Sequence, residues 1–245
     1  MSSPTPTDHV LDMLAVARVA RKGSPLKDSA FQSARAVMAF AKGPDAALAA
    51  VAEVTAGAEA LWAQVRGTPA FALGTAPAAC RKGCGWCCHQ PVGAAAIEVL
   101  AIAERLRGTA AAWTLAAWQP GSPCAFLDNG ACGIYGIRPL KCRSLYNLDV
   151  RYCMKAYAKV ELPSAGPPPS SEHQTAPMDI FEGAVLGLAH GLWSAGRDCP
   201  GVEFMPALRA VIDVADATDR WWRGEAVFGS ASRLDWFPPP KRRTR

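Results

Sequence analysis

Cysteine is the residue type that points most clearly to chemistry, because eight of the nine cysteines fall within one segment of the chain. The first four form a C-x3-C-x2-C-C run, and the other four follow at intervals of eight, ten and eleven residues. Cysteines that return from a second stretch of chain are what a closed thiolate site requires. The candidate metal ligands are Cys80, Cys84, Cys87, Cys88, Cys124, Cys132, Cys142 and Cys153.

Thiolate is a soft ligand that selects zinc, iron–sulfur clusters or Cu(I) over calcium and magnesium. Cys84 and Cys87 form the C-x2-C pair whose loop lets two sulfurs converge on one metal. Cys88 follows Cys87 directly, so these side chains diverge unless the backbone bends. They could serve different metal atoms, or one could be a structural thiol. His89 is a candidate nitrogen ligand or a hydrogen-bond donor behind the ligands.

Basic residues flank the cysteines and would offset the negative charge of a metal–thiolate site. Cations beside a thiol also lower its pKa, which favours the bound thiolate. This reasoning supports a metal but does not choose between zinc and iron. The cations are Arg81, Lys82, Arg138, Lys141 and Arg143, and the apolar neighbours that would exclude water are Trp86, Phe126, Leu127, Ile134 and Tyr135.

Three other interpretations of the cysteines stay open. Structural disulfides would need an oxidising compartment. Buried inert thiols would leave the clustering unexplained. A redox pair of the Cys-x-x-Cys kind normally accompanies a strand–helix–strand pattern, which the sequence does not show.

Two motif blocks resemble the YkgJ-type cysteine-cluster family. They are CRKGCGWCCHQPV (Cys80 to Val92) and CAFLDNGACGIYGIRPLKCR (Cys124 to Arg143). The resemblance covers about residues 80–153 and implies a module that chelates zinc or iron through the cysteines, without a defined reaction. The first interval is one residue longer than in some members, and Cys124-Ala125-Phe126 stands where Cys-Pro-Phe is usual.

The cluster is also similar to that of a flagellin lysine methylase, which suggests an iron–sulfur-dependent enzyme or redox partner as an alternative. A Cu(I) thiolate store is a further one. No Gly-rich strand–helix turn for a methyl-donor nucleotide appears in the sequence, so whether the protein is an enzyme stays open. The expected cofactor is zinc or a 4Fe-4S cluster, and the expected partner is a metal ion.

Composition and charge limit which partners and which cellular compartment are expected for this protein. Half of the residues are hydrophobic and the net charge is +5, partly from a basic tail. This permits an acidic partner without demanding one, and nucleic acid is not expected as a partner. The N-terminus shows no secretory signal, and no membrane-spanning segment is expected. We therefore expect a cytoplasmic protein, where cysteines favour metal over disulfide.

Apolar periodicity and alanine content predict a mostly α fold, with a helical scaffold around an irregular Cys-rich segment. Helices are expected near 7–19, 28–41, 45–66, 94–107, 110–118, 178–195 and 205–223, and another after Pro139 that carries Cys142. Loops with turns are expected at 119–133.

Composition also suggests how the chain is organised. The expected parts are an N-terminal helical region (1–79), the cysteine-cluster domain (80–160), a Pro-rich linker (161–177), C-terminal helices (178–236) and a basic tail (237–245). Outside the cluster, His190 is expected in the core, and Trp221-Trp222 is expected to pack at a helix end. His9 and His173 are assigned no role.

Overall fold

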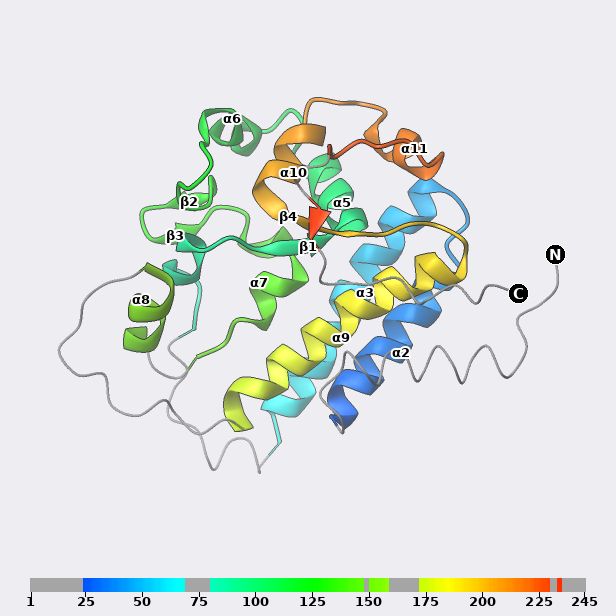
Figure 1. The fold of residues 1–245 in the computed structure, drawn as a ribbon. Helices are drawn as coiled ribbons and strands as arrows, with labels where there is room; N and C mark the ends of the chain where they lie inside the picture. The colour runs from blue at the N-terminus through cyan, green and yellow to red at the C-terminus, as the bar shows by residue number, and fades with distance from the viewer. Residues whose placement is uncertain (1–23, 69–79, 148–149, 159–171, 230–232, 235–245) are drawn as a thin grey trace.

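The computed structural model describes residues 24–68, 80–147, 150–158, 172–229 and 233–234, and it confirms a mostly α fold (Figure 1). The expected helix at 7–19 and the basic tail lie outside these residues. The α-helices are α2 (Pro25–Ala39), α3 (Pro44–Arg66), α5 (Ala96–Leu106), α6 (Ala110–Ala117), α7 (Leu140–Ser144), α8 (Val150–Ala158), α9 (Glu172–Ser194), α10 (Phe204–Val211) and α11 (Ala217–Trp222). Two short 3₁₀ helices are η1 (Trp86–His89) and η2 (Tyr135–Ile137).

Helix α2 begins where the sequence supplies a capping residue. The Ser24 hydroxyl accepts a hydrogen bond from the backbone N–H of Lys27 at 3.3 Å, and Pro25 occupies the first turn. The same hydroxyl donates to Asp179 of α9 at 2.8 Å. The cap therefore fixes both the start of α2 and its position against α9.

Helices α2 and α9 pack unusually closely and run in the same direction, side by side in Figure 1. Gly183, Gly187 and Gly191 of α9 face successive turns of α2. A Cβ atom added at Gly187 would meet the carbonyl oxygen of Phe31 and would lie 2.6 Å from the Cβ of Ala34. The spacing of four residues therefore removes side chains from one stripe of α9, so that the two backbones can approach.

A three-stranded antiparallel sheet lies against α5 and α10, and the sequence analysis did not predict it. Its order is β1 (Gly93–Ala95), β4 (Gly201–Glu203) and β5 (Arg233–Leu234). In its register Ala94 lies opposite Val202, and Val202 lies opposite Arg233. Each strand has only two or three residues, which is too short for an alternating pattern to be visible.

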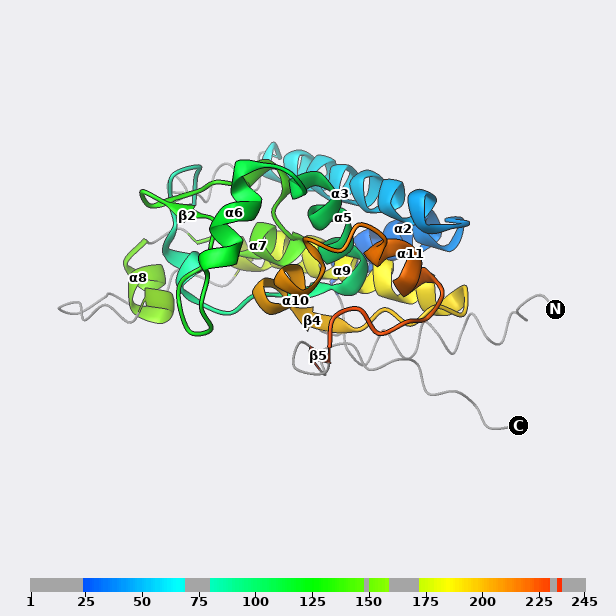
Figure 2. The same ribbon diagram turned by 90° about the horizontal axis from the view of Figure 1, so that it is seen from above.

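The main core lies between the sheet and the helices α2, α3, α5, α9 and α10. Its largest fully buried side chains include Ile97, Leu100, Ile180, Leu188 and Leu208. Viewed from above, α3 runs along one side of the molecule, whereas α8 and the hairpin strand β2 lie together at one end (Figure 2). That end holds most of the cysteine-bearing segments.

Three predicted boundaries need correction. The segment expected as one helix at 205–223 is divided into α10 and α11, because the Arg107 side chain donates to the carbonyls of Ile212 and Val214 at the bend. Residues 172–177 of the expected linker are the first turns of α9, with Pro177 inside the helix. The loop expected at 119–133 contains a hairpin, β2 (Leu127–Asp128) with β3 (Ala131–Cys132).

Helix α3 is the one candidate membrane span among the described residues. By length and composition alone it is apolar enough to cross a bilayer, with 28% of its most apolar window buried. Core helices of globular proteins meet the same criterion. One face of α3 packs on the core through Ala47, Val51 and Val54.

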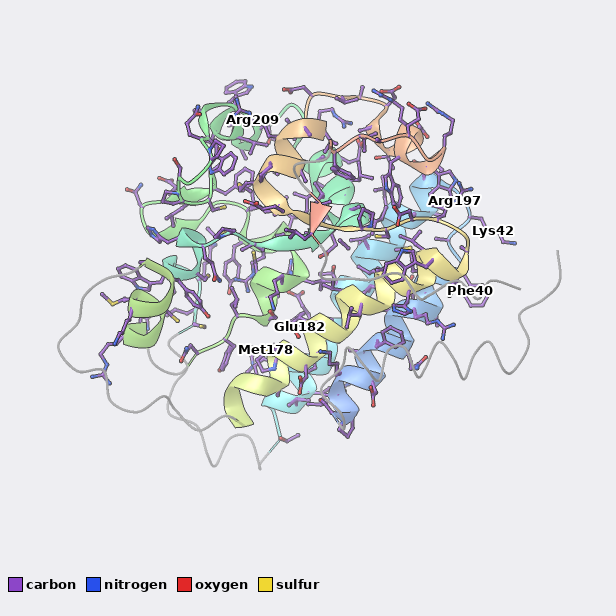
Figure 3. The ribbon with its side chains drawn as sticks, viewed as in Figure 1. Phe40, Lys42, Met178, Glu182, Arg197 and Arg209 are labelled. Carbon is purple, nitrogen blue, oxygen red and sulfur yellow. The ribbon has the colours of Figure 1, made fainter. Side chains whose placement is uncertain are left out.

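Phe40, which follows α2 and is labelled in Figure 3, is 82% exposed.

Candidate metal centre

The first cysteine block is compact because its backbone turns tightly and touches the second block. Gly83 has a φ of 95°, a conformation that favours glycine, and η1 then carries Cys87 and Cys88. Gly85 lies so close to the β2–β3 hairpin that an added Cβ would be 2.5 Å from the carbonyl oxygen of Gly130. The glycines of this block therefore allow the close approach that brings thiols from both blocks together.

The second block begins at Cys124 with a direct hydrogen bond to the first. The backbone N–H of Cys124 donates to the carbonyl oxygen of Cys88 at 2.8 Å. The hairpin that follows turns at Asn129 and Gly130, which have φ values of 47° and 78°. This turn returns the chain to Cys132, which ends β3.

Cys142 is carried by α7, whose start is fixed from α5. Pro139 is the N-cap residue, and the next backbone N–H, that of Leu140, donates to Glu98 of α5 at 2.9 Å. Lys141 forms an ion pair with Glu182 of α9, which is labelled in Figure 3. The expected helix after Pro139 is therefore confirmed, and it is anchored from two sides.

Arg143, one residue after Cys142, holds the chain around α7 in place. Its side chain is buried and donates to the carbonyl oxygens of Arg138, at 3.0 Å, and Gly136, at 2.7 Å. It also forms an ion pair with Glu59 of α3. These partners satisfy much of the guanidinium, so Arg143 acts as a structural cation that orients the cysteine-bearing turn.

Cys80 and Cys153 meet at the other side of the cluster. The backbone N–H of Asn147 donates to the Cys80 sulfur at 2.9 Å, and the Cys80 N–H donates to the Asn147 carbonyl at 3.3 Å. The thiol of Cys153, on α8, is hydrogen-bonded to that of Cys80. The first and last candidate cysteines are therefore neighbours in space.

The eight candidate cysteines border two adjoining pockets, which we call pocket A and pocket B. Pocket A has a volume of about 260 Å³ and is bordered by Cys80, Cys84, Cys87, Cys142 and Cys153. Pocket B has a volume of about 100 Å³ and is bordered by Cys84, Cys87, Cys88, Cys124, Cys132 and Cys142. The ninth cysteine, Cys199, is fully buried in the main core and borders neither pocket.

Comparison with known families now identifies the segment. Residues 79–159, a third of the chain, match the model of the family described as "CxxCxxCC: Putative zinc- or iron-chelating domain". We refer to residues 79–159 as the CxxCxxCC domain, after the family model that they match. The match confirms the cysteine-cluster resemblance that the two motif blocks suggested. None of the curated proteins and none of the solved structures matches the chain.

The thiols of the CxxCxxCC domain are gathered but not arranged as ligands around one point. Within the described residues, no group of three or more His, Cys, Asp or Glu side chains lies close enough together to hold an ion. All nine cysteines are free thiols. Neighbouring thiols form hydrogen-bonded pairs instead, as between Cys87 and Cys88 and between Cys88 and Cys124.

The flanking cations lower the thiol pKa values as expected, but burial and neighbouring thiols outweigh them in most of the cluster. Burial raises the pKa of Cys142, and a hydrogen bond from a neighbouring thiol together with burial raises the pKa of Cys88 to about 12. Only the pKa of Cys80 is lowered, to about 7, chiefly by the hydrogen bond of this thiol with Cys153. Of the flanking cations, Lys82 is exposed and Lys141 is engaged by Glu182.

Arg138 shows that the CxxCxxCC domain fits a metal–thiolate group. Its Nε atom is buried and has no hydrogen-bond partner among the described residues, and its guanidinium lies 3.9 Å from the centre of the Tyr135 ring. A buried cationic group with an unsatisfied donor is costly unless an anion compensates it. Neutral thiols offer no such charge, whereas thiolates around a zinc or iron centre do. Donor type and counter-charge therefore both suit the metal.

The remaining candidates take structural roles or none. His89 is exposed, borders pocket B and stacks on Trp86 with 6.2 Å between ring centres. His190 is buried between Phe31 and Trp193, which confirms a core histidine. Trp221 is also buried, as expected for a helix end packed on the core.

Glu98 is the residue that the sequence analysis missed. The helical pattern places it among the polar residues of α5, yet it is only 2% exposed. One carboxylate oxygen accepts from the N–H of Ala95 and the other from the N–H of Leu140, both at 2.9 Å. It thus caps α5 and also the helix that carries Cys142. A glutamate at the third position of a helix was the available signal.

Replacing Glu98 with glutamine is expected to lower the free energy of unfolding by about 1–3 kcal/mol, since one buried backbone N–H loses its acceptor. Urea denaturation measures the change. The matched control is Glu104→Gln on the same helix, where the partly exposed pair with Arg107 predicts a loss below about 1 kcal/mol. Equal losses in the two variants would contradict the capping role.

Proposed function

We propose that the CxxCxxCC domain binds zinc or a 4Fe-4S cluster through the thiolates of its eight clustered cysteines. The observation that carries this proposal is the gathering of eight free thiols, from segments up to 73 positions apart in sequence, around two adjoining pockets. Such a set is suited to soft metals and poorly suited to calcium or magnesium, which prefer oxygen ligands.

The family description supports metal chelation in general and does not distinguish zinc from iron. When bound, the metal would supply a multivalent cation that holds the thiols as thiolates. Zinc would crosslink the two cysteine blocks, and an iron–sulfur cluster would in addition accept or donate an electron. The chain's own contribution is to converge the thiols, to shield them with apolar residues and to provide Arg138 as a counter-charge.

Elemental analysis of protein purified without oxygen is the experiment that tests the proposal. Zinc in a colourless protein indicates a zinc–thiolate site. Iron with acid-labile sulfide in a brown protein indicates an iron–sulfur cluster. Copper would replace the proposal with a Cu(I) store, and a folded protein that takes up none of these metals would refute it.

Serine substitutions test whether the clustered cysteines bind the metal. Cys87→Ser and Cys132→Ser are each expected to lower the metal content and the melting temperature together, because each removes a thiolate donor. Cys199→Ser is the matched control, since Cys199 is buried in the core and borders neither pocket. Equal loss of metal in all three variants would count against the assignment.

An iron–sulfur-dependent enzyme or redox partner is the second candidate, and the wall of pocket A favours it. Beside its thiols this pocket is bordered by Arg66, Arg81, Trp62 and Tyr157. A closed structural zinc site needs no such accessible space. Reversible reduction of the purified protein, followed by its visible absorption, distinguishes this function from a structural role. For either function we propose a cytoplasmic location, where free thiols persist.

A further inference from the structure

The two pockets share a wall, and its composition bears on how many metal sites the cluster contains. Cys84, Cys87 and Cys142 border both pockets, and so does Arg138. Pocket A has two further thiols of its own, Cys80 and Cys153. The cluster is therefore two groups of thiols that overlap, with five around one pocket and six around the other.

Four of the five thiols that border only one pocket are also paired with a neighbour on their own side. Cys80 and Cys153 are hydrogen-bonded to each other at pocket A. Cys88 is hydrogen-bonded to Cys124 at pocket B, and the backbones of these two residues are joined as well. Cys87 and Cys88 are adjacent in sequence, yet Cys87 borders both pockets whereas Cys88 borders pocket B alone.

Arg138 is the cation of the shared wall, since its side chain borders both pockets. One cation placed between two groups of thiolates offsets charge on both sides, which is the arrangement that two neighbouring anionic sites require.

We propose that the cluster forms two metal sites, one at each pocket, between which the thiolates of Cys84, Cys87 and Cys142 are divided. This inference rests on the proposed function and adds to it the number and division of the sites. A tetrahedral zinc ion takes four ligands, so eight thiols exceed the need of one ion. Cys80 and Cys153 with two thiols of the shared wall make four ligands at pocket A, and the three thiols of pocket B alone with the remaining wall thiol make four at pocket B.

Zinc reconstitution of the apoprotein tests the division, with zinc per chain measured by mass spectrometry. Wild type is expected to bind two zinc ions, because each pocket supplies a full set of thiols. Cys153→Ser and Cys124→Ser are each expected to lose one ion and keep the other. Cys87→Ser in the shared wall is likewise expected to lose one ion, because the seven remaining thiols complete only one set of four. Cys199→Ser is the matched control and should bind as wild type does.

The possible failures are distinguishable. Uptake of a single zinc ion by wild type, or loss of all zinc in both Cys153→Ser and Cys124→Ser, would overturn the two-site inference and leave metal binding intact. A folded wild type that takes up no zinc, iron or copper would instead refute the proposed function. Far-UV circular dichroism of each variant shows whether loss of zinc accompanies loss of helix.

Cadmium substitution of wild type tests the division of the wall thiolates without any variant that needs to fold. Two cadmium resonances without coupling to each other are the expected NMR result. Coupling through a common sulfur would retain two sites but overturn the division of Cys84, Cys87 and Cys142 between them. A single resonance would overturn both parts of the inference.

Discussion

Removing the metal with a chelator is expected to destabilise the CxxCxxCC domain by on the order of 10 kcal/mol for each closed site. This is comparable to the whole free energy of unfolding of a typical domain. The reason lies in the local structure around the thiols. The first block holds one short 3₁₀ helix, the hairpin has strands of two residues, and α7 has five. Backbone hydrogen bonds alone therefore do little to hold these segments.

The helical remainder is expected to behave differently. Helices α2, α3, α5 and α9 share an apolar core that contains no candidate ligand other than partly buried Cys124 and Cys132 at its edge. Most of the helical circular dichroism should therefore survive chelation, while the two cysteine blocks, residues 80–92 and 124–143, become sensitive to proteolysis. Added zinc should restore protection.

Cys87→Ser protein is the control, because chelator should change its digestion pattern much less than that of wild type. The same digestion pattern and melting temperature in wild type with and without chelator would contradict a stabilising metal.

Gly187→Ala is expected to lower the free energy of unfolding by about 3 kcal/mol, at the upper end of the usual cost of overpacking. The added methyl group would meet the carbonyl oxygen of Phe31 and lie 2.9 Å from the backbone nitrogen of Arg35. Backbone atoms inside a helix cannot rotate away as a flexible side chain can. Helices α2 and α9 must therefore separate, and their contact along Gly183 and Gly191 is lost as well.

Gly57→Ala in α3 is the matched control and should change stability in the opposite direction. Gly57 is exposed in a helix interior, and nothing lies within 4 Å of an added Cβ. Alanine there is expected to stabilise the helix by roughly 0.5–1 kcal/mol. Urea denaturation of both variants measures the contrast. Destabilisation of the same size in both would show that the α2–α9 contact is looser than the structure indicates.

The sequence was sufficient to predict the features that have a regular or dense pattern of residues. Regular apolar spacing predicted α3 and α5 closely, and the density of cysteines predicted the segment that the family comparison identifies. The assignment of individual cysteines as ligands stays a prediction. Glycines at a spacing of four in α9 were a visible signal for close helix packing that was not used.

Other features depend on contacts between distant residues and leave no local pattern. The third helix position of Glu98 signals a cap for α5, but only the fold brings the start of α7 to its carboxylate. The sheet joins residues 93–95 to 201–203, which neither segment reveals alone. Burial likewise reversed the expected shift of the thiol pKa values, because desolvation of Cys142 outweighs the effect of Arg138.

The ion pairs of α7 have a consequence for anyone who wishes to transplant the chelating module. Lys141 and Arg143 flank Cys142, and their carboxylate partners Glu182 and Glu59 both lie outside residues 79–159. A fragment cut at the limits of the family match would leave both cations without their carboxylate partners. It would also lose β4, the strand that pairs with β1. A minimal portable version should therefore include α3 and α9.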